Sequence, residues 1–133
     1  MKRILIMGLP GAGKTTLAAK LSEKLGDNCL WLNADAVREQ FNDWDFSREG
    51  RIRQSQRMRD LADASDKKYV LADFVAPLVE MREIFQADFT IWMDTIVQGR
   101  FADTNSVFDQ PLKFDLQIQD FNYDVDDILE SLL

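Results

Sequence analysis

The stretch GLPGAGKTT, residues 8–16, has residue types and spacing that suit the binding of a chain of phosphates. It fits the pattern G-x-x-x-x-G-K-[ST], and the apolar run ILIM directly precedes it. Glycines let backbone N–H groups turn inward around phosphate oxygens, and a following helix adds its positive end. Lys14 can reach the β- and γ-phosphates as a catalytic group, and the Thr15 hydroxyl can ligate Mg²⁺. We therefore expect ATP and Mg²⁺ to be bound by a phosphate loop made of Gly8, Leu9, Pro10, Gly11, Ala12, Gly13, Lys14, Thr15 and Thr16.

The phosphate loop indicates a nucleotide, and other features of the sequence narrow the reaction. A switch GTPase normally carries a base-reading motif of the N-K-x-D kind, which the sequence lacks, and a large motor ATPase needs more than 133 residues. The absence of histidine excludes histidine acid–base catalysis and histidine-ligated zinc. These exclusions favour a small-molecule kinase, which needs a donor cradle, an acceptor pocket and a cover.

Two carboxylates follow apolar stretches that read as strands. Asp35 comes after CLWLN and Asp73 comes after YVLA. Ligands of an open parallel sheet bind beyond the carboxyl ends of its strands, so both carboxylates should face the site. Asp35 suits the orientation or deprotonation of an acceptor hydroxyl, and the nearby Arg38 suits an anionic acceptor. Asp73 suits the Mg²⁺ shell, together with Thr15. The alternative is that both carboxylates are ordinary caps at strand ends.

A helix is expected at residues 47–65, with Ser47 as its N-cap. A buried arginine is costly unless it meets an anion, so an arginine on the inner face of this helix is a candidate for acceptor binding. A structural salt bridge is the alternative. At 100° per residue, the residues expected on the inner face are Arg51, Gln54, Met58, Leu61 and Ser65, and those expected in solvent are Arg53 and Arg59.

Apolar runs that alternate with helical patterns predict an α/β protein. We expect strands at 3–7, 29–33, 68–74, 89–93 and 114–118, and further helices at 15–25, 77–85 and 124–133. Pro77 should lie in the first turn of its helix. The fold class predicted is a three-layer P-loop NTPase fold, with a five-stranded parallel sheet flanked by helices in one domain, residues 1–133. Residues 94–111 have no clean period, which is typical of a functional loop such as a lid.

Composition limits the partners of the chain. A net charge of −7 argues against nucleic-acid binding, which needs clustered lysine and arginine. No apolar run approaches the ~20 residues of a membrane span, so no membrane partner is expected. The single cysteine, Cys29, permits no internal disulfide and fits a reducing cytoplasm.

These residues resemble the adenylylsulfate kinase family, which transfers the γ-phosphoryl group of MgATP to the 3′-hydroxyl of adenosine 5′-phosphosulfate. GLPGAGKTT is similar to its phosphate loop, and LNADAVR resembles L-D-G-D-N-[IV]-R, which implies acceptor-site roles for Asp35 and Arg38. FSREGRIRQSQR resembles F-S-x-x-D-R-x-E-N-I-R-R. This second likeness implies that Phe46 stacks on adenine, that Arg51 contacts a substrate phosphate or sulfate, and that Gln54 takes the place of an asparagine.

Two further segments extend the resemblance. FVAP resembles F-I-S-P, which implies that Phe74 and Val75 contact the substrate. FADTNSVFDQP matches the length and end points of F-T-G-I-D-x-P-Y-E-x-P, which makes Phe101 the second ring around adenine. The family also often forms homodimers, although nothing in this sequence marks a dimer surface.

The sequence also departs from the family pattern. The first aspartate of D-G-D-N is Asn33, and the other changed positions are Ala36, Gly50 and Ala76. A basic lid of the type E-R-D-x-K-G-L-Y-K-K-A is missing between Gln98 and Gly99, which leaves Arg100 as the nearby basic residue that could replace it in catalysis. Losing such charge stabilisation can cost ~10²-fold in rate. Three readings stay open: an adenylylsulfate kinase, a kinase for another small acceptor such as a nucleoside, nucleotide or sugar, and a nucleotide-binding protein with little turnover.

Overall fold

The central strand β1 (Lys2–Met7) alternates its side chains between two apolar cores. Ile4 and Ile6 pack in one core, and Leu5 and Met7 pack in the other. A strand that is apolar on both faces must be covered on both, as is usual in parallel sheets. This run of buried residues therefore already requires helices on each side of the sheet.

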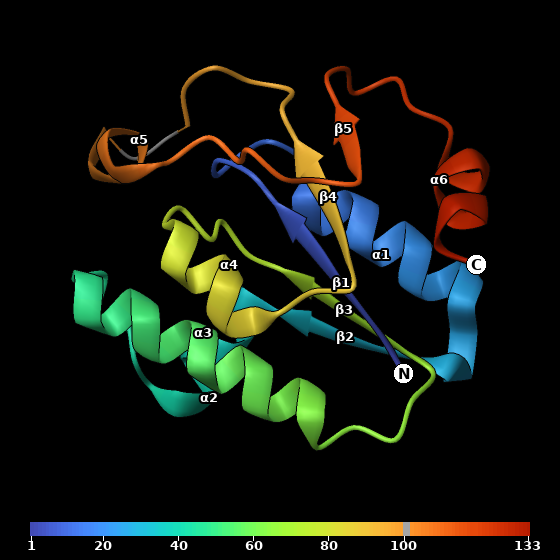
Figure 1. Cartoon of the computed structure of the whole chain (residues 1–133), viewed down its shortest axis with the longest axis horizontal. Helices are drawn as coiled ribbons and strands as arrows, with labels where there is room; N and C mark the ends of the chain where they lie inside the picture. Colours follow the sequence, from blue (N-terminus) through green and yellow to red (C-terminus); the bar gives the residue numbers. More distant parts are fainter. Residues whose placement is uncertain (100–101) are drawn as a thin grey trace.

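The computed structural model describes residues 1–99 and 102–133, and it contains one five-stranded sheet (Figure 1). The strand order is β2-β3-β1-β4-β5, and every neighbouring pair is parallel. The predicted three-layer α/β fold is confirmed. The remaining strands are β2 (Cys29–Asn33), β3 (Tyr69–Asp73), β4 (Phe89–Met93) and β5 (Leu116–Ile118).

Helices cover both faces of this sheet (Figure 1). The helices α1 (Lys14–Leu25) and α6 (Val125–Leu132) contribute to the core that contains Ile4. The helices α2 (Ala34–Phe41), α3 (Arg48–Asp63) and α4 (Val79–Phe85) contribute to the core that contains Leu5. The chain also forms α5 (Ala102–Val107) and a short 3-10 turn, η1 (Gly26–Asn28). None of the helices in the described part of the chain has the length and apolar character to cross a membrane.

The structure corrects the expected elements at three places. Helix α2 was not predicted, although Asn33 caps it by accepting a hydrogen bond from the backbone N–H of Ala36. Pro77 lies outside α4, because Leu78 keeps an extended backbone and acts as the N-cap. Residues 94–111, expected to be irregular, contain α5. The expected N-cap of α3, Ser47, is confirmed.

Candidate active site

The phosphate loop connects β1 to α1, and its glycines occupy positions that other residues would not fit. A Cβ on Gly8 would lie 2.6 Å from the Met93 carbonyl oxygen. Gly13 has a φ of 96°, in the left-handed region that glycine adopts most readily. Lys14 is buried, and its Nζ donates a hydrogen bond to the Leu9 carbonyl at 3.0 Å. The loop thus lies between a strand and a helix, which is the context that the motif requires.

Asp73, at the carboxyl end of β3, is the polar centre of this edge of the sheet. It is buried, and it accepts hydrogen bonds from Trp31 Nε1 at 2.6 Å, Asn33 Nδ2 at 3.1 Å and Thr15 Oγ1 at 3.2 Å. Burial raises the pKa of the Asp73 carboxyl, whereas the three donors and the nearby Lys14 lower it. Asp73 therefore connects β2 and β3 to the start of the nucleotide-binding helix.

Asn33 connects the two halves of the site. Its side-chain oxygen caps α2, and its Nδ2 donates to Asp73 and, at 3.3 Å, to Thr15 Oγ1. Helix α2 carries Asp35 and Arg38. One amide side chain therefore contacts both the phosphate-loop helix and the helix with the predicted acceptor residues. Sequence reasoning recorded Asn33 only as a departure from a family pattern, although an asparagine before an alanine-rich segment is an N-cap signal.

A single cavity of about 450 Å³ brings most of the predicted site residues together. Asp35 is exposed there at the first turn of α2. Arg100 and Phe101 lie outside the described residues. The predicted residues that line the cavity are Pro10, Gly11, Gly13, Lys14, Thr15, Thr16, Asp35, Arg38, Phe46, Arg51, Gln54, Asp73, Phe74 and Val75. The lining residues that sequence reasoning did not assign to the site are Asn33, Ala34, Ala76, Pro77, Met81 and Thr104.

Two arginines flank the half-exposed ring of Phe46. The guanidinium carbon of Arg38 lies 4.3 Å from the ring centroid, and that of Arg51 lies 5.7 Å from it. Such cation–π contacts fix the orientation of a ring and of its cations. Both arginines are buried, and burial lowers the pKa of Arg38 from its ordinary value. Arginine stays charged in proteins, so this side of the cavity attracts anions.

The inner face of α3 agrees with the predicted face over its first half. Arg51, Gln54 and Met58 are buried as predicted. Toward the end of the helix, Leu61 is only half-buried and Ala62 occupies the core instead. Ser65 is also half-buried but lies beyond the helix, which ends at Asp63 rather than at residue 65 as predicted. Of the two arginines predicted to face solvent, Arg53 is exposed and Arg59 is half-buried, and each pairs with an aspartate.

Residues 94–99 lie against the phosphate loop, next to the position where the family lid is missing. The Thr95 hydroxyl donates to the Ala12 carbonyl at 2.7 Å. The Asn105 side chain of α5 both accepts from the Gly99 N–H at 2.7 Å and donates to its carbonyl at 3.1 Å. A Cβ on Gly99 would lie 3.0 Å from Pro10 Cδ. A short segment therefore packs on the phosphate loop, and α5 contributes the buried Thr104 to the cavity.

Comparison with known proteins places these features in a family. The family model described as "Adenylylsulphate kinase" matches residues 2–103. The Mycobacterium tuberculosis APS kinase CysC, in complex with AMPPNP and APS, has a TM-score of 0.81 and 21% identity, over 98% of this chain and 94% of that chain. No sequence among the curated proteins matches significantly.

Kinases for other acceptors have the same fold at lower similarity. A gluconokinase from Sinorhizobium meliloti has a TM-score of 0.64 and 14% identity, over 99% of this chain and 89% of that chain. A shikimate kinase from Acinetobacter baumannii, in complex with shikimate, has a TM-score of 0.65 and 19% identity, over 98% and 90%. These likenesses show a shared fold, whereas the family match covers most of the sequence. The chain belongs to the adenylylsulfate kinase family and has the fold of a P-loop kinase.

Proposed function

We propose that this protein transfers the γ-phosphoryl group of ATP to the 3′-hydroxyl of adenosine 5′-phosphosulfate. One observation carries this proposal: the phosphate loop and the residues that the family pattern assigns to the acceptor line the same cavity. In-line phosphoryl transfer requires the donor and the acceptor hydroxyl to meet in one enclosed space. The free Cys29 supports action in a reducing compartment such as the cytoplasm.

The donor half of the cavity fits ATP with Mg²⁺. The exposed Thr15 hydroxyl lies at the start of α1, next to Asp73, and hydroxyl and carboxylate oxygens suit Mg²⁺. In the described part of the chain, no cluster of three or more acidic or cysteine side chains could hold a metal alone. Thr15 would therefore share the ion with phosphate oxygens, while Asp73 orients Thr15. When bound, Mg²⁺ neutralises charge on the β- and γ-phosphates, and Lys14 adds its charge at the same oxygens.

The acceptor half of the cavity fits an anionic adenosine derivative. The exposed Asp35 would orient or deprotonate the attacking hydroxyl. Arg38 and Arg51 would bind the phosphate or sulfate, and the exposed part of the Phe46 ring would stack on adenine, a contact worth about 1–3 kcal/mol. The roles of Arg100 and Phe101, and a homodimer, remain predictions.

Two other functions are each favoured by a particular observation. Another small acceptor is favoured by Asn33 and Ala76, which line the cavity and differ from the family pattern. The shared fold with a gluconokinase and a shikimate kinase fits the same alternative. A nucleotide-binding protein with little turnover is favoured by the missing lid, because that basic lid would add charge stabilisation during transfer. Among the described residues that line the cavity, the basic ones are Lys14, Arg38 and Arg51.

An ADP-release assay with a panel of acceptors distinguishes these three functions. We expect turnover with adenosine 5′-phosphosulfate but not with a nucleoside or a sugar, and loss of turnover in Lys14→Ala.

Phe46→Ala should raise the KM for the acceptor about tenfold through lost stacking, with ATP binding unchanged. Phe41→Ala is the matched control, because Phe41 is equally exposed and lies under Arg57 but does not line the cavity. Faster turnover with another acceptor, or an equal rate without any acceptor, would contradict the proposal.

A further inference from the structure

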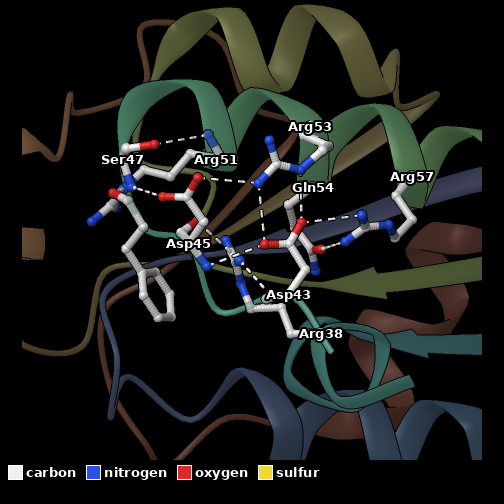
Figure 2. Close-up of polar contacts among 10 residues, drawn as sticks. Arg38, Asp43, Asp45, Ser47, Arg51, Arg53, Gln54 and Arg57 are labelled. Carbon is white, nitrogen blue, oxygen red and sulfur yellow. Dashed lines mark hydrogen bonds and ion pairs between the residues drawn. The ribbon is translucent and has the colours of Figure 1, made fainter. Parts of the chain in front are cut away.

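The segment that joins α2 to α3, residues 42–47, is held from its outer side by acid–arginine pairs. The Asp43 carboxylate accepts from Arg53 Nε at 2.7 Å and from Arg57 Nη2 at 3.1 Å. The Asp45 carboxylate accepts from Arg53 Nη2 at 3.1 Å and from the Ser47 N–H at 2.9 Å. Figure 2 shows Arg53 between the two aspartates. The hydrogen bond from Arg53 is the largest cause that holds the pKa of Asp43 well below its usual range.

The same segment is held from the cavity side by its backbone carbonyls. Arg38 Nη1 donates to the carbonyls of Asp43 at 3.0 Å and of Asp45 at 3.2 Å. Arg51 Nε donates to the carbonyl of Phe46 at 2.8 Å. The arginines expected to bind the acceptor anion therefore also fix the backbone that carries the stacking ring. Their position and that of Phe46 cannot change independently.

Gly50 lets the segment lie directly against the first turn of α3. A Cβ at this position would collide with the carbonyl oxygen and the carboxyl carbon of Asp45. Gly50 is buried and its own backbone conformation is helical, so the requirement is for space rather than for a special φ. A side chain here would push Asp45, and with it Phe46, away from the helix.

The Asp43 charge offsets repulsion among the arginines around this segment. Four arginines, Arg38, Arg51, Arg53 and Arg57, surround the segment (Figure 2). Asp43 raises the pKa of the buried Arg38, whereas Arg51 and Arg57 lower it. Without the Asp43 charge, the arginines repel one another across a partly desolvated space. Asp43 therefore allows the cavity residues Arg38 and Arg51 to lie close to each other and to Arg57.

We propose that Asp43, supported by Asp45 and Gly50, is a positioning residue of the acceptor site. We call these three residues the clamp. The clamp fixes Phe46, Arg38 and Arg51 in the positions from which they would bind an anionic, adenosine-bearing acceptor. The clamp itself touches no substrate and acts through the ring and the two arginines. Its effect on acceptor binding rests on the proposed function, whereas its effect on the segment does not.

The position of the segment can be measured without any substrate. Trp44 lies within it and is half-exposed, so 5-fluorotryptophan labelling provides a reporter in ¹⁹F NMR, with Trp44→Phe to assign its signal. Asp43→Asn and Gly50→Ala should each shift or broaden the Trp44 signal and leave the Trp31 and Trp92 signals in place. Asp126→Asn, which breaks an exposed pair with Lys24, is the matched control and should change none of them. An unchanged Trp44 signal in Asp43→Asn would refute the clamp.

Kinetics then separate positioning from general structural damage. Asp43→Asn should raise the acceptor KM about tenfold and leave the ATP KM unchanged, since a displaced binding group weakens only its own ligand. Asp43→Glu, which keeps the charge, should recover part of the loss. An equal rise in both KM values would show a structural role and overturn the proposal, as would an unchanged acceptor KM. If the wild type turns over none of the acceptors, the proposed function fails, and the ¹⁹F result still decides whether the clamp exists.

Discussion

The neutral amide of Asn33 lies beside the buried carboxylate of Asp73. Asn33 donates to both oxygens of Asp73, at 3.1 and 3.3 Å. An aspartate at position 33 would place two carboxylates at this separation, and like charges so close raise the pKa of the pair. The amide instead stabilises the ionised form of Asp73, which burial opposes. The Asn33 amide therefore lowers the pKa of Asp73 and offsets part of the upward shift that burial causes.

The exchange Asn33→Asp should destabilise the protein in a pH-dependent way. The raised folded-state pKa of the pair means that deprotonation costs more in the folded than in the unfolded protein, so stability falls as pH rises above about 4, the ordinary pKa of aspartate. At pH 7 we expect a loss of about 2 kcal/mol in the free energy of unfolding. Thermal unfolding from pH 4 to pH 8 measures the difference from wild type.

The variant Asn33→Ser is the control for this experiment. Serine keeps the N-cap of α2 but removes the amide donor to Asp73 without adding a charge. Its difference in stability from the wild type should change much less with pH than that of Asn33→Asp. Parallel pH profiles of the two variants would contradict the like-charge argument.

Residue patterns predicted most of the side chains that line the cavity, for physical reasons. The phosphate loop is a local motif, so its spacing alone fixes the placement of Lys14 and Thr15. Asp35 and Asp73 follow strands, and the parallel sheet brings such ends together. The role of Asp43 was not predicted, because its partner Arg53 was expected in solvent and its partner Arg57 was not singled out by the helix wheel.

At the scale of elements, the short segment after β4 packs on the phosphate loop. Residues 94–99 contact the phosphate loop through Thr95 and Gly99. The Asn105 side chain of α5 accepts a hydrogen bond from the Gly99 N–H. The hydrogen bond from Thr95 reaches the carbonyl of Ala12, inside the nucleotide-binding motif. The segment therefore stabilises the phosphate loop itself.

Removing this contact with Thr95→Val should weaken nucleotide binding. Loss of a hydrogen bond of this kind costs roughly 0.5–1.5 kcal/mol, which corresponds to a rise of about two- to tenfold in the ATP KM, with the acceptor KM unchanged. Thr90→Val is the matched control, since Thr90 lies on the same β4 strand away from the loop. A rise limited to the acceptor KM would contradict this role for the segment.

Elements were predicted best where the sequence has a clear apolar pattern bounded by turn residues. The strands at 29–33 and 89–93 have the expected bounds, because each is a continuous apolar run between turn residues. Helix α2 was missed because it is short and carries only one buried apolar residue, Val37. Helix α4 was predicted to include Pro77 in its first turn. It begins later, at Val79, because Leu78 is extended and acts as the N-cap.

At the scale of the molecule, an acidic protein presents a cavity whose ends are both suited to anions. The net charge is −7, yet Lys14, Arg38 and Arg51 all line the cavity. The fold explains this contrast, since the phosphate loop and the arginine-bearing helices meet at one edge of the sheet. Composition alone argues against a polyanion partner, and it says nothing about a local site for small anions.

Binding of MgATP should therefore stabilise the whole fold. At a ligand concentration about 100 times Kd, linkage adds about 2.7 kcal/mol, which raises the Tm by several degrees for a domain of this size. Differential scanning fluorimetry with MgATP tests this, and Lys14→Ala should show a much smaller shift. A wild-type Tm that does not respond to MgATP would contradict a nucleotide site in this cavity.

The two separate cores of the sheet have a consequence for how such an enzyme can change its substrate. The layer with α1 supports the phosphate loop, and the layer with α2, α3 and α4 supports the residues that we propose to bind the acceptor. Repacking the second layer can remodel what is phosphorylated while the foundation of the donor cradle stays intact. An architecture divided in this way allows acceptor preference to diverge among kinases that retain a common nucleotide-binding half.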